Sequence, residues 1–354
     1  MRTFGFIAIQ TLVFLFLVSA CQGQVDQRTK SEVKENAGSL PTGHQLYGPY
    51  NKNNPNNEPG LEIMAWTNDI HEDQNGIMWF GTKGWGVIRY DGATVIYIST
   101  AQGLAGNDVR DIAEDKDGAL WLGTDGGLSK WENESFTHYT TKDGLVNDDV
   151  HSLAIDSRGL IWIGTAQGLS TFNGEEFSTF ELPESESDSV NFVRSTNMVH
   201  SIMEDRKGNI WLGTNGGAYI FDGTNLDNLS EADGLCDNTV KSILEDRNGD
   251  FWFSTQNEGV CRWDGTVFTK VETEPHPYGS MASAQLFEDS SGDIWLPIEG
   301  VSMFCYHGDG LEKMFEPQGC ISHTLRCAYE DSKGRIWFGG WNGVYRYDGS
   351  AKTF

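Results

Sequence analysis

A series of basic side chains recurs along this 354-residue chain at regular intervals. Each follows the first hydrophobic residue of a short β-like run, and the seven positions hold, in chain order, Asn68, Arg110, His151, His200, Lys241, Ala284 and Arg326. Five of the seven carry or can acquire a positive charge, in a chain of formal net charge −26. Such groups bind carboxylates, sulfates or acidic sugars through charge-assisted hydrogen bonds. Alternatively, each basic side chain pairs with a neighbouring Asp or Glu.

Aromatic side chains accompany this series in two loops. The first repeat carries Trp85 and the last carries Trp341-Asn342, where the other repeats carry small polar residues. Aromatic faces stack on the apolar faces of sugar rings, while amides and Arg bind hydroxyl and carboxylate groups. If the first and last repeats are neighbours, these residues line a ligand site beside Arg326. Packing between repeats is the alternative use of both tryptophans.

Sequence signatures of catalysis are absent. There is no Gly-x-Ser-x-Gly elbow, no His-Glu-x-x-His motif and no phosphate-binding glycine loop that opens a helix. We therefore predict no catalytic residue, no cofactor and no metal. The catalytic alternative starts from His151 and His200, which could hold a divalent metal, although no Glu at a fixed spacing partners them. A protein-interaction scaffold is a further alternative.

Recurring tryptophans identify the elements that must position these residues. They are Trp79, Trp121, Trp162, Trp211, Trp252, Trp295 and Trp337, at steps of 42, 41, 49, 41, 43 and 42 residues. A fixed period of this size is typical of radial or solenoidal repeats.

Each period contains four short β-like runs separated by turn residues. In the fifth they are Val240–Leu244, Asp250–Ser254, Gly259–Trp263 and Val267–Val271. One such meander cannot bury both of its faces, so about seven of them should pack face to face and close into a ring. The sequence predicts a seven-bladed β-propeller of four-stranded antiparallel blades over residues 61–354. Trp should fill the gaps between blades, and the recurring Glu-Asp pairs should form turns.

The repeated pattern resembles the two-component regulator propeller repeat. Its form is Ile/Leu-x-Glu-Asp-x-x-Gly-x-x-Trp-x-Gly-Thr, followed by Gly-Leu/Val and an aromatic-Asp/Asn-Gly turn, and it covers residues 66–354. The resemblance implies a ligand-sensing propeller of the cell envelope. Lyases and lactonases of similar propeller fold keep the catalytic alternative open. The sequence contains no kinase or receiver segment after the repeats, so we expect signalling to need a separate membrane sensor protein.

The N-terminal residues predict the location of the protein. Residues 1–20 combine Arg2 with an apolar run and end in Val18-Ser19-Ala20, directly before Cys21. This arrangement is typical of a secretory signal and resembles a bacterial lipobox, in which the Cys is acylated. Residues 21–60 are polar and predict a flexible tether. We expect a lipid-anchored protein that faces the periplasm or lies at the outer membrane.

Composition and cysteine content complete these expectations. A strongly acidic surface repels nucleic acid and anionic lipid, so the expected partners are a small-molecule or oligosaccharide ligand and a sensor protein, with no nucleic acid. Five cysteines follow Cys21, and they are Cys236, Cys261, Cys305, Cys320 and Cys327. Their odd number leaves at least one thiol unpaired within the chain. These cysteines show no Cys-x-x-Cys spacing, and we identify no neighbouring His at a metal-ligand spacing, so the sequence argues against zinc.

Overall fold

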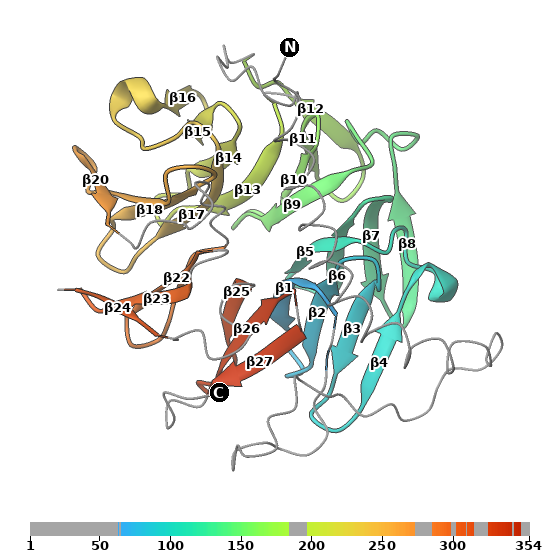
Figure 1. Ribbon diagram of the computed structural model, residues 1–354. Helices are drawn as coiled ribbons and strands as arrows, with labels where there is room; N and C mark the ends of the chain where they lie inside the picture. Colours follow the sequence, from blue (N-terminus) through green and yellow to red (C-terminus); the bar gives the residue numbers. More distant parts are fainter. Residues whose placement is uncertain are drawn as a thin grey trace, which may run out of the picture. The chain divides into compact units, whose positions relative to one another are not determined.

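The computed structural model shows seven antiparallel β-sheets that follow one another around a ring (Figure 1). It describes residue 63 and residues 65–183, 197–272, 285–298, 302–308, 310–314, 325–341 and 343–347. Contacts divide the chain into residues 1–44 and 45–354, and every described residue belongs to the second unit. None of the described helices is long and apolar enough to cross a membrane.

Each sheet is a meander whose strands are paired in sequence order. The first two blades contain β1 (Thr67–Glu72), β2 (Met78–Thr82), β3 (Val87–Tyr90) and β4 (Val95–Ile98), then β5 (Val109–Glu114), β6 (Leu120–Thr124), β7 (Gly127–Glu132) and β8 (Ser135–Tyr139). The third and fourth contain β9 (Val150–Ile155), β10 (Ile161–Thr165), β11 (Gly168–Phe172) and β12 (Phe177–Phe180), then β13 (Val199–Glu204), β14 (Ile210–Thr214), β15 (Gly217–Phe221) and β16 (Leu226–Leu229).

The remaining blades continue this order. The fifth and sixth contain β17 (Val240–Glu245), β18 (Phe251–Thr255), β19 (Val260–Trp263) and β20 (Phe268–Val271), then β21 (Phe287–Glu288), β22 (Ile294–Ile298), β23 (Ser302–Tyr306) and β24 (Leu311–Lys313). The seventh contains β25 (Leu325–Glu330), β26 (Ile336–Gly340) and β27 (Gly343–Tyr347). Two 3₁₀ turns, η1 (Thr100–Gln102) and η2 (Glu231–Asp233), follow the fourth strands of blades one and four. The seven-bladed propeller predicted from the sequence is confirmed, with three strands among the described residues of the last blade.

The repeated tryptophans pack between blades, as predicted. Trp79 of blade one lies in a cluster with Leu120 and Leu122 of blade two, and the other six tryptophans occupy equivalent clusters. Trp337 closes the ring, because it packs against Ile70 and Phe80 of the first blade. All seven side chains are at most 3% exposed. The hydrophobic core is therefore a ring of seven inter-blade layers.

Every one of these tryptophans also donates a hydrogen bond. Trp79 Nε1–H donates to Asp73 Oδ2 at 2.9 Å, and the same indole-to-carboxylate bond occurs in all seven blades. The other oxygen of Asp73 accepts the backbone N–H groups of Asn75 and Ile77. The Asp of each Glu-Asp pair is thus a turn residue, as predicted, and it also anchors the buried indole.

The Glu of the pair binds across the blade boundary. In blade four, Glu204 accepts the backbone N–H and the hydroxyl of Ser157 in blade three, each at 2.7 Å. Equivalent bonds join every pair of neighbouring blades except the second and third, where Ile155 stands at the Glu position. The bond from Ser332 Oγ–H to Glu72 Oε1, at 2.9 Å, joins the last blade to the first. These carboxylates therefore stabilise the ring.

Close packing against the next blade explains the Gly of each Gly-Thr step. A Cβ atom on Gly123 of blade two would lie 2.8 Å from Val150 Cγ1 of blade three. A disulfide further links Cys236, in the connection between blades four and five, to Cys261 of β19. Cys305 and Cys327 are buried free thiols, so the expectation of an unpaired thiol is confirmed.

Candidate functional site

The predicted basic series coincides with a repeated β-bulge. In β1 the register passes from the pair Thr67–Thr82 directly to Asp69–Gly81, so Asn68 has no partner on β2. The first strand of each blade is called its inner strand. The same irregularity skips the series residue on five further inner strands, namely Arg110, His151, His200, Lys241 and Arg326. A bulge bends the strand and redirects the extra side chain. Six blades therefore present their series residue at the beginning of the inner strand.

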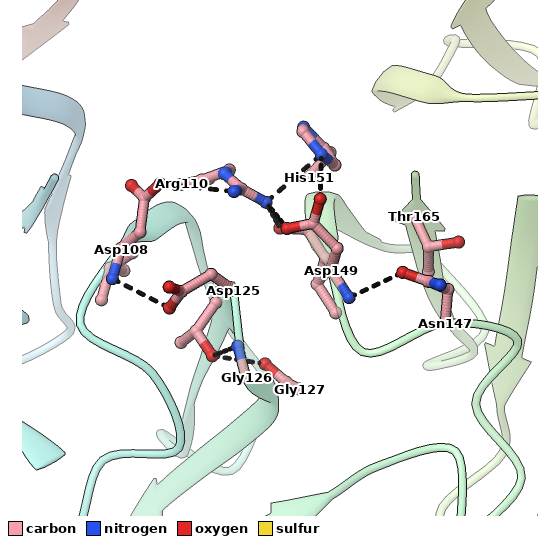
Figure 2. Close-up of polar contacts among 12 residues, drawn as sticks. Asp108, Arg110, Asp125, Gly126, Gly127, Asn147, Asp149, His151 and Thr165 are labelled. Atoms are coloured by element: carbon pink, nitrogen blue, oxygen red, sulfur yellow. Dashed lines mark hydrogen bonds and ion pairs between the residues drawn. The ribbon is translucent and has the colours of Figure 1, made fainter. Parts of the chain in front are cut away.

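Side chains of the series bind from blade to blade. Asn68 Nδ2–H donates to Asp108 Oδ1 at 3.0 Å and to the carbonyl oxygen of Val109 at 2.9 Å. The guanidinium of Arg110 lies between Asp108, at 3.3 Å, and Asp149, with which it forms an ion pair (Figure 2). Partial burial would raise the pKa of Asp149, but the hydrogen bond and charge of Arg110 hold that pKa below its usual value. The pairing of basic residues with carboxylates, left open by the sequence, occurs at Arg110.

The two histidines of the series lie next to each other, and each contacts a cation. Their rings meet edge to face, with centroids 6.4 Å apart. His151 Nε2 lies 3.2 Å from the Arg110 guanidinium and 3.2 Å from Asp149 Oδ2. His200 Nε2 lies 3.1 Å from Lys241 Nζ and 2.7 Å from the side-chain oxygen of Asn215. Arg110, His151, His200 and Lys241 thus form one continuous polar arc across blades two to five.

A tryptophan stack stands where the first and last blades meet. Trp66 and Trp341 stack with ring centroids 4.6 Å apart and an interplanar angle of 27°. Lys83 Nζ lies 4.1 Å from the Trp66 ring centroid, and the Arg326 guanidinium carbon lies 5.4 Å from it. Trp341 is nevertheless 46% exposed. The structure therefore brings two predicted site residues, Trp341 and Arg326, to one aromatic and cationic surface.

A pair of acidic residues lies one residue beyond the bulges of the first two blades, with Asp69 buried and Asp111 partly buried. Asp69 accepts the backbone N–H of Ile112 at 2.9 Å, and Asp111 accepts that of Leu153 at 2.7 Å. Burial raises the pKa of Asp69 to about 6, and the charge of His71 opposes this rise. Burial and the neighbouring charge of Asp69 raise the pKa of Asp111 well above its usual value. Both carboxyl groups therefore favour the protonated form more than isolated carboxyls do.

The remaining predicted site residues lie apart from these clusters. Trp85 is 63% exposed and stacks on none of the described aromatic rings. Ala284 and Asn342 lie outside the described residues, as do the predicted signal peptide, Cys21 and residues 21–60. The sequence reasoning missed Asp108, Asp149 and Asn215, which contact the polar arc. For the two aspartates a signal was available, because each directly precedes the first hydrophobic residue of its inner strand.

Comparison with known families supports the repeat assignment. The two component regulator propeller model matches residues 60–84, 103–126, 144–167, 194–216, 234–257 and 321–342. The chain therefore contains six segments that match the two-component regulator propeller repeat. These segments leave out the sixth blade, where Pro297-Ile298 replaces Gly-Thr. No curated protein sequence matches the chain.

Solved structures share the propeller fold at low sequence identity. The extracellular domain of the one component system BT4673 from B. thetaiotaomicron is 18% identical with a TM-score of 0.66, and the match covers 80% of this chain and 38% of that domain. PorZ of the type-IX secretion system of Porphyromonas gingivalis is 17% identical with a TM-score of 0.63, and the match covers 81% of this chain and 48% of PorZ. Virginiamycin B lyase from Staphylococcus aureus is 13% identical with a TM-score of 0.63, and the match covers 80% of this chain and 94% of the lyase. This chain therefore spans well under half of the sensor extracellular domain it matches.

Proposed function

We propose that this propeller is the ligand-binding part of an envelope sensing system, and that it binds acidic saccharides or other small anions without converting them. The observation that carries the proposal is the repeated bulge, which places one polar side chain, mostly basic, on the first strand of six of the seven blades. Strand pairing skips these positions, so it does not require basic residues there, and their recurrence in an acidic chain supports ligand recognition.

The surroundings of the histidines favour an anion over a metal. Arg110 contacts His151 Nε2 and Lys241 contacts His200 Nε2. A divalent cation at these nitrogens would meet the positive charges of Arg110 and Lys241, and the carboxylate beside them, Asp149, is already ion-paired with Arg110. A metal-dependent lyase, the alternative suggested by the similar fold of virginiamycin B lyase, is therefore the weaker candidate.

The tryptophan stack supplies the second half of the proposed site. An exposed face of Trp341 can stack on a sugar ring, and Arg326 and Lys83 next to Trp66 can bind its carboxylate. We propose that ligand binding here is communicated to a separate membrane sensor protein, and that the predicted signal and Cys21 place the chain in the cell envelope.

Calorimetric titration of the protein with an oligogalacturonate and with a matched neutral oligosaccharide tests this proposal. Arg326→Ala should weaken binding of the acidic sugar by about 1.5–3 kcal/mol through loss of a charge-assisted bond, and added salt should weaken it in the parent protein. Trp341→Ala should weaken binding of both sugars. Arg206→Ala is the control, because this Arg pairs with Glu245 at the blade turns and is 53% exposed.

Two outcomes would overturn the proposal. One is equal binding by Arg326→Ala, Trp341→Ala and the parent, or no binding of either sugar. The other is metal-dependent consumption of the sugar, which would establish the lyase in its place.

A further inference from the structure

A cluster of potential metal ligands lies on the sixth blade, away from the proposed ligand site. Asp293 directly precedes β22, Cys305 is on β23, and His307 directly follows β23. One ligand atom from each lies within 4.8 Å of the other two, and no other group of three or more such residues occurs in the described part of the chain. Alternate residues of a strand share a face, so Cys305 and His307 point the same way. The sequence-based judgement that no His stands in register with a cysteine is wrong here.

The distances suit tetrahedral coordination. Asp293 Oδ2 lies 2.9 Å from His307 Nδ1, and Cys305 Sγ lies 3.8 Å from the same nitrogen. A zinc ion with bonds of about 2.0 Å to nitrogen and oxygen and about 2.3 Å to sulfur sets its ligand atoms about 3.3–3.6 Å apart. The observed spacings bracket this range, so small side-chain movements would complete the site.

The second ring nitrogen of His307 already has the partner that a metal ligand needs. Nε2 lies 3.4 Å from Glu312 Oε2 on β24. A ligating His usually donates its other N–H to a carboxylate, which fixes the tautomer and turns the free nitrogen toward the metal. Cys305 is fully buried in the layer between blades six and seven, whereas the His307 side chain is 37% exposed. The site therefore has a buried soft ligand and a side open to solvent.

We propose that Asp293, Cys305 and His307 bind a divalent transition-metal ion of the zinc type, with Glu312 as the positioning residue of His307. Binding replaces the thiol proton of Cys305, which is released to solvent, by a metal–sulfur bond. The dipositive ion offsets two of the three negative charges of the Cys305 thiolate, Asp293 and Glu312. The metal would link the start of β22 to the end of β23, in the blade whose first strand, β21, has only two residues.

The competing explanation is a metal-free one. In it, a protonated His307 donates to Asp293 from Nδ1 and to Glu312 from Nε2, and the Cys305 thiol is only packed nearby. The two explanations differ in whether sulfur bonds to a cation.

Titration of the untagged full chain with Co²⁺, with its disulfide intact and no added reductant, distinguishes them. We expect one equivalent of Co²⁺ to produce the near-ultraviolet absorption of a thiolate–cobalt bond, and Zn²⁺ to remove it and to raise the melting temperature. Cys305→Ser and His307→Gln should lose the absorption. His307 is partly exposed, so His307→Gln remains informative if Cys305→Ser fails to fold. Cys327→Ser and Cys320→Ser are matched thiol controls and should keep it.

The metal-free explanation predicts no thiolate–cobalt absorption in the parent protein, and that result would overturn the proposal. Persistence of the absorption in Cys305→Ser, or its loss in either control variant, would overturn it equally, because the thiolate would then come from another residue.

Discussion

Single carboxylates in this protein have different tasks according to what surrounds them. Asp205 accepts two backbone N–H groups and the indole of Trp211, and although burial opposes it, these bonds lower its pKa. Asp69 faces a second carboxyl group in a buried position, and its pKa is raised. A fall in pH should therefore change the contributions of these two types of carboxylate to the stability of the fold in opposite directions. A depressed pKa contributes stability that is lost as pH falls, whereas a raised pKa costs stability as pH rises.

The pair Asp69–Asp111 gives the first test at this scale. Between a pH of about 4 and a pH of about 6 the folded protein holds more protons on Asp69 than the unfolded chain, so this group lowers stability as pH rises through that window. Asp69→Asn mimics the protonated form and keeps an acceptor for Ile112. It should raise the free energy of unfolding at pH 7 by about 1–3 kcal/mol and flatten its pH dependence in the window.

Chemical denaturation at pH 4, 6 and 8 measures this effect. Asp237→Asn is the control, because Asp237 is a buried Asp that accepts the backbone N–H groups of Thr239 and Asn257. It should not stabilise the protein. Destabilisation by Asp69→Asn at pH 7 would contradict this expectation, because it would show that the native Asp69 carboxyl stabilises the fold.

At the scale of elements, the blades are joined by a layer of tryptophans and by a ring of glutamate bonds. The tryptophan layer could be predicted because one large side chain recurs at a fixed spacing. The bulges could not, since Val109-Arg110-Asp111-Ile112 has no residue type that marks an extra position in the ladder. The Asp69–Asp111 pair was equally hidden, because its members come from two repeats and meet only when the ring forms. The Cys305–His307 pair was visible as alternate residues but depends on Asp293 from another strand.

The glutamate bonds predict how sensitive each blade boundary is. Glu72→Ala removes the bond between the last and first blades, and Glu204→Ala removes the matched bond between blades three and four. Each should lower the free energy of unfolding by about 0.5–1.5 kcal/mol, as measured by urea denaturation. If only Glu204→Ala destabilises, the Glu72 bond contributes nothing and closure depends on the other contacts between the last and first blades.

At the scale of the whole propeller, closure uses residues from both ends of the repeat array. The backbone N–H of Val344 in β27 donates to the carbonyl oxygen of Ile63 at 3.2 Å. Ile63 is fully buried in the same layer as Trp337, although it precedes the first strand. The chain before blade one therefore contributes to the layer between the last and first blades, which the repeat pattern alone did not indicate.

The proposed envelope location concerns the molecule as a whole and has a direct test. If Cys21 is acylated, cells that produce the protein should incorporate a labelled palmitate analogue into it, and the protein should sediment with membranes. Cys21→Ser should abolish labelling and release the protein from the membrane fraction, while Cys327→Ser, in a buried thiol of the propeller, should change neither. Unchanged labelling of Cys21→Ser would refute lipid attachment at this residue.

The repeated bulge has a consequence for how such a protein changes over evolutionary time. Because the ladder skips one residue at the same place in each described bulge, a mutation there leaves the neighbouring strand pairs in place. Duplication or exchange of a whole repeat within the gene would transfer a complete blade together with the residue at its bulge. New combinations of these residues can therefore arise by recombination without a new folding problem, so the ring can diversify its recognition one repeat at a time.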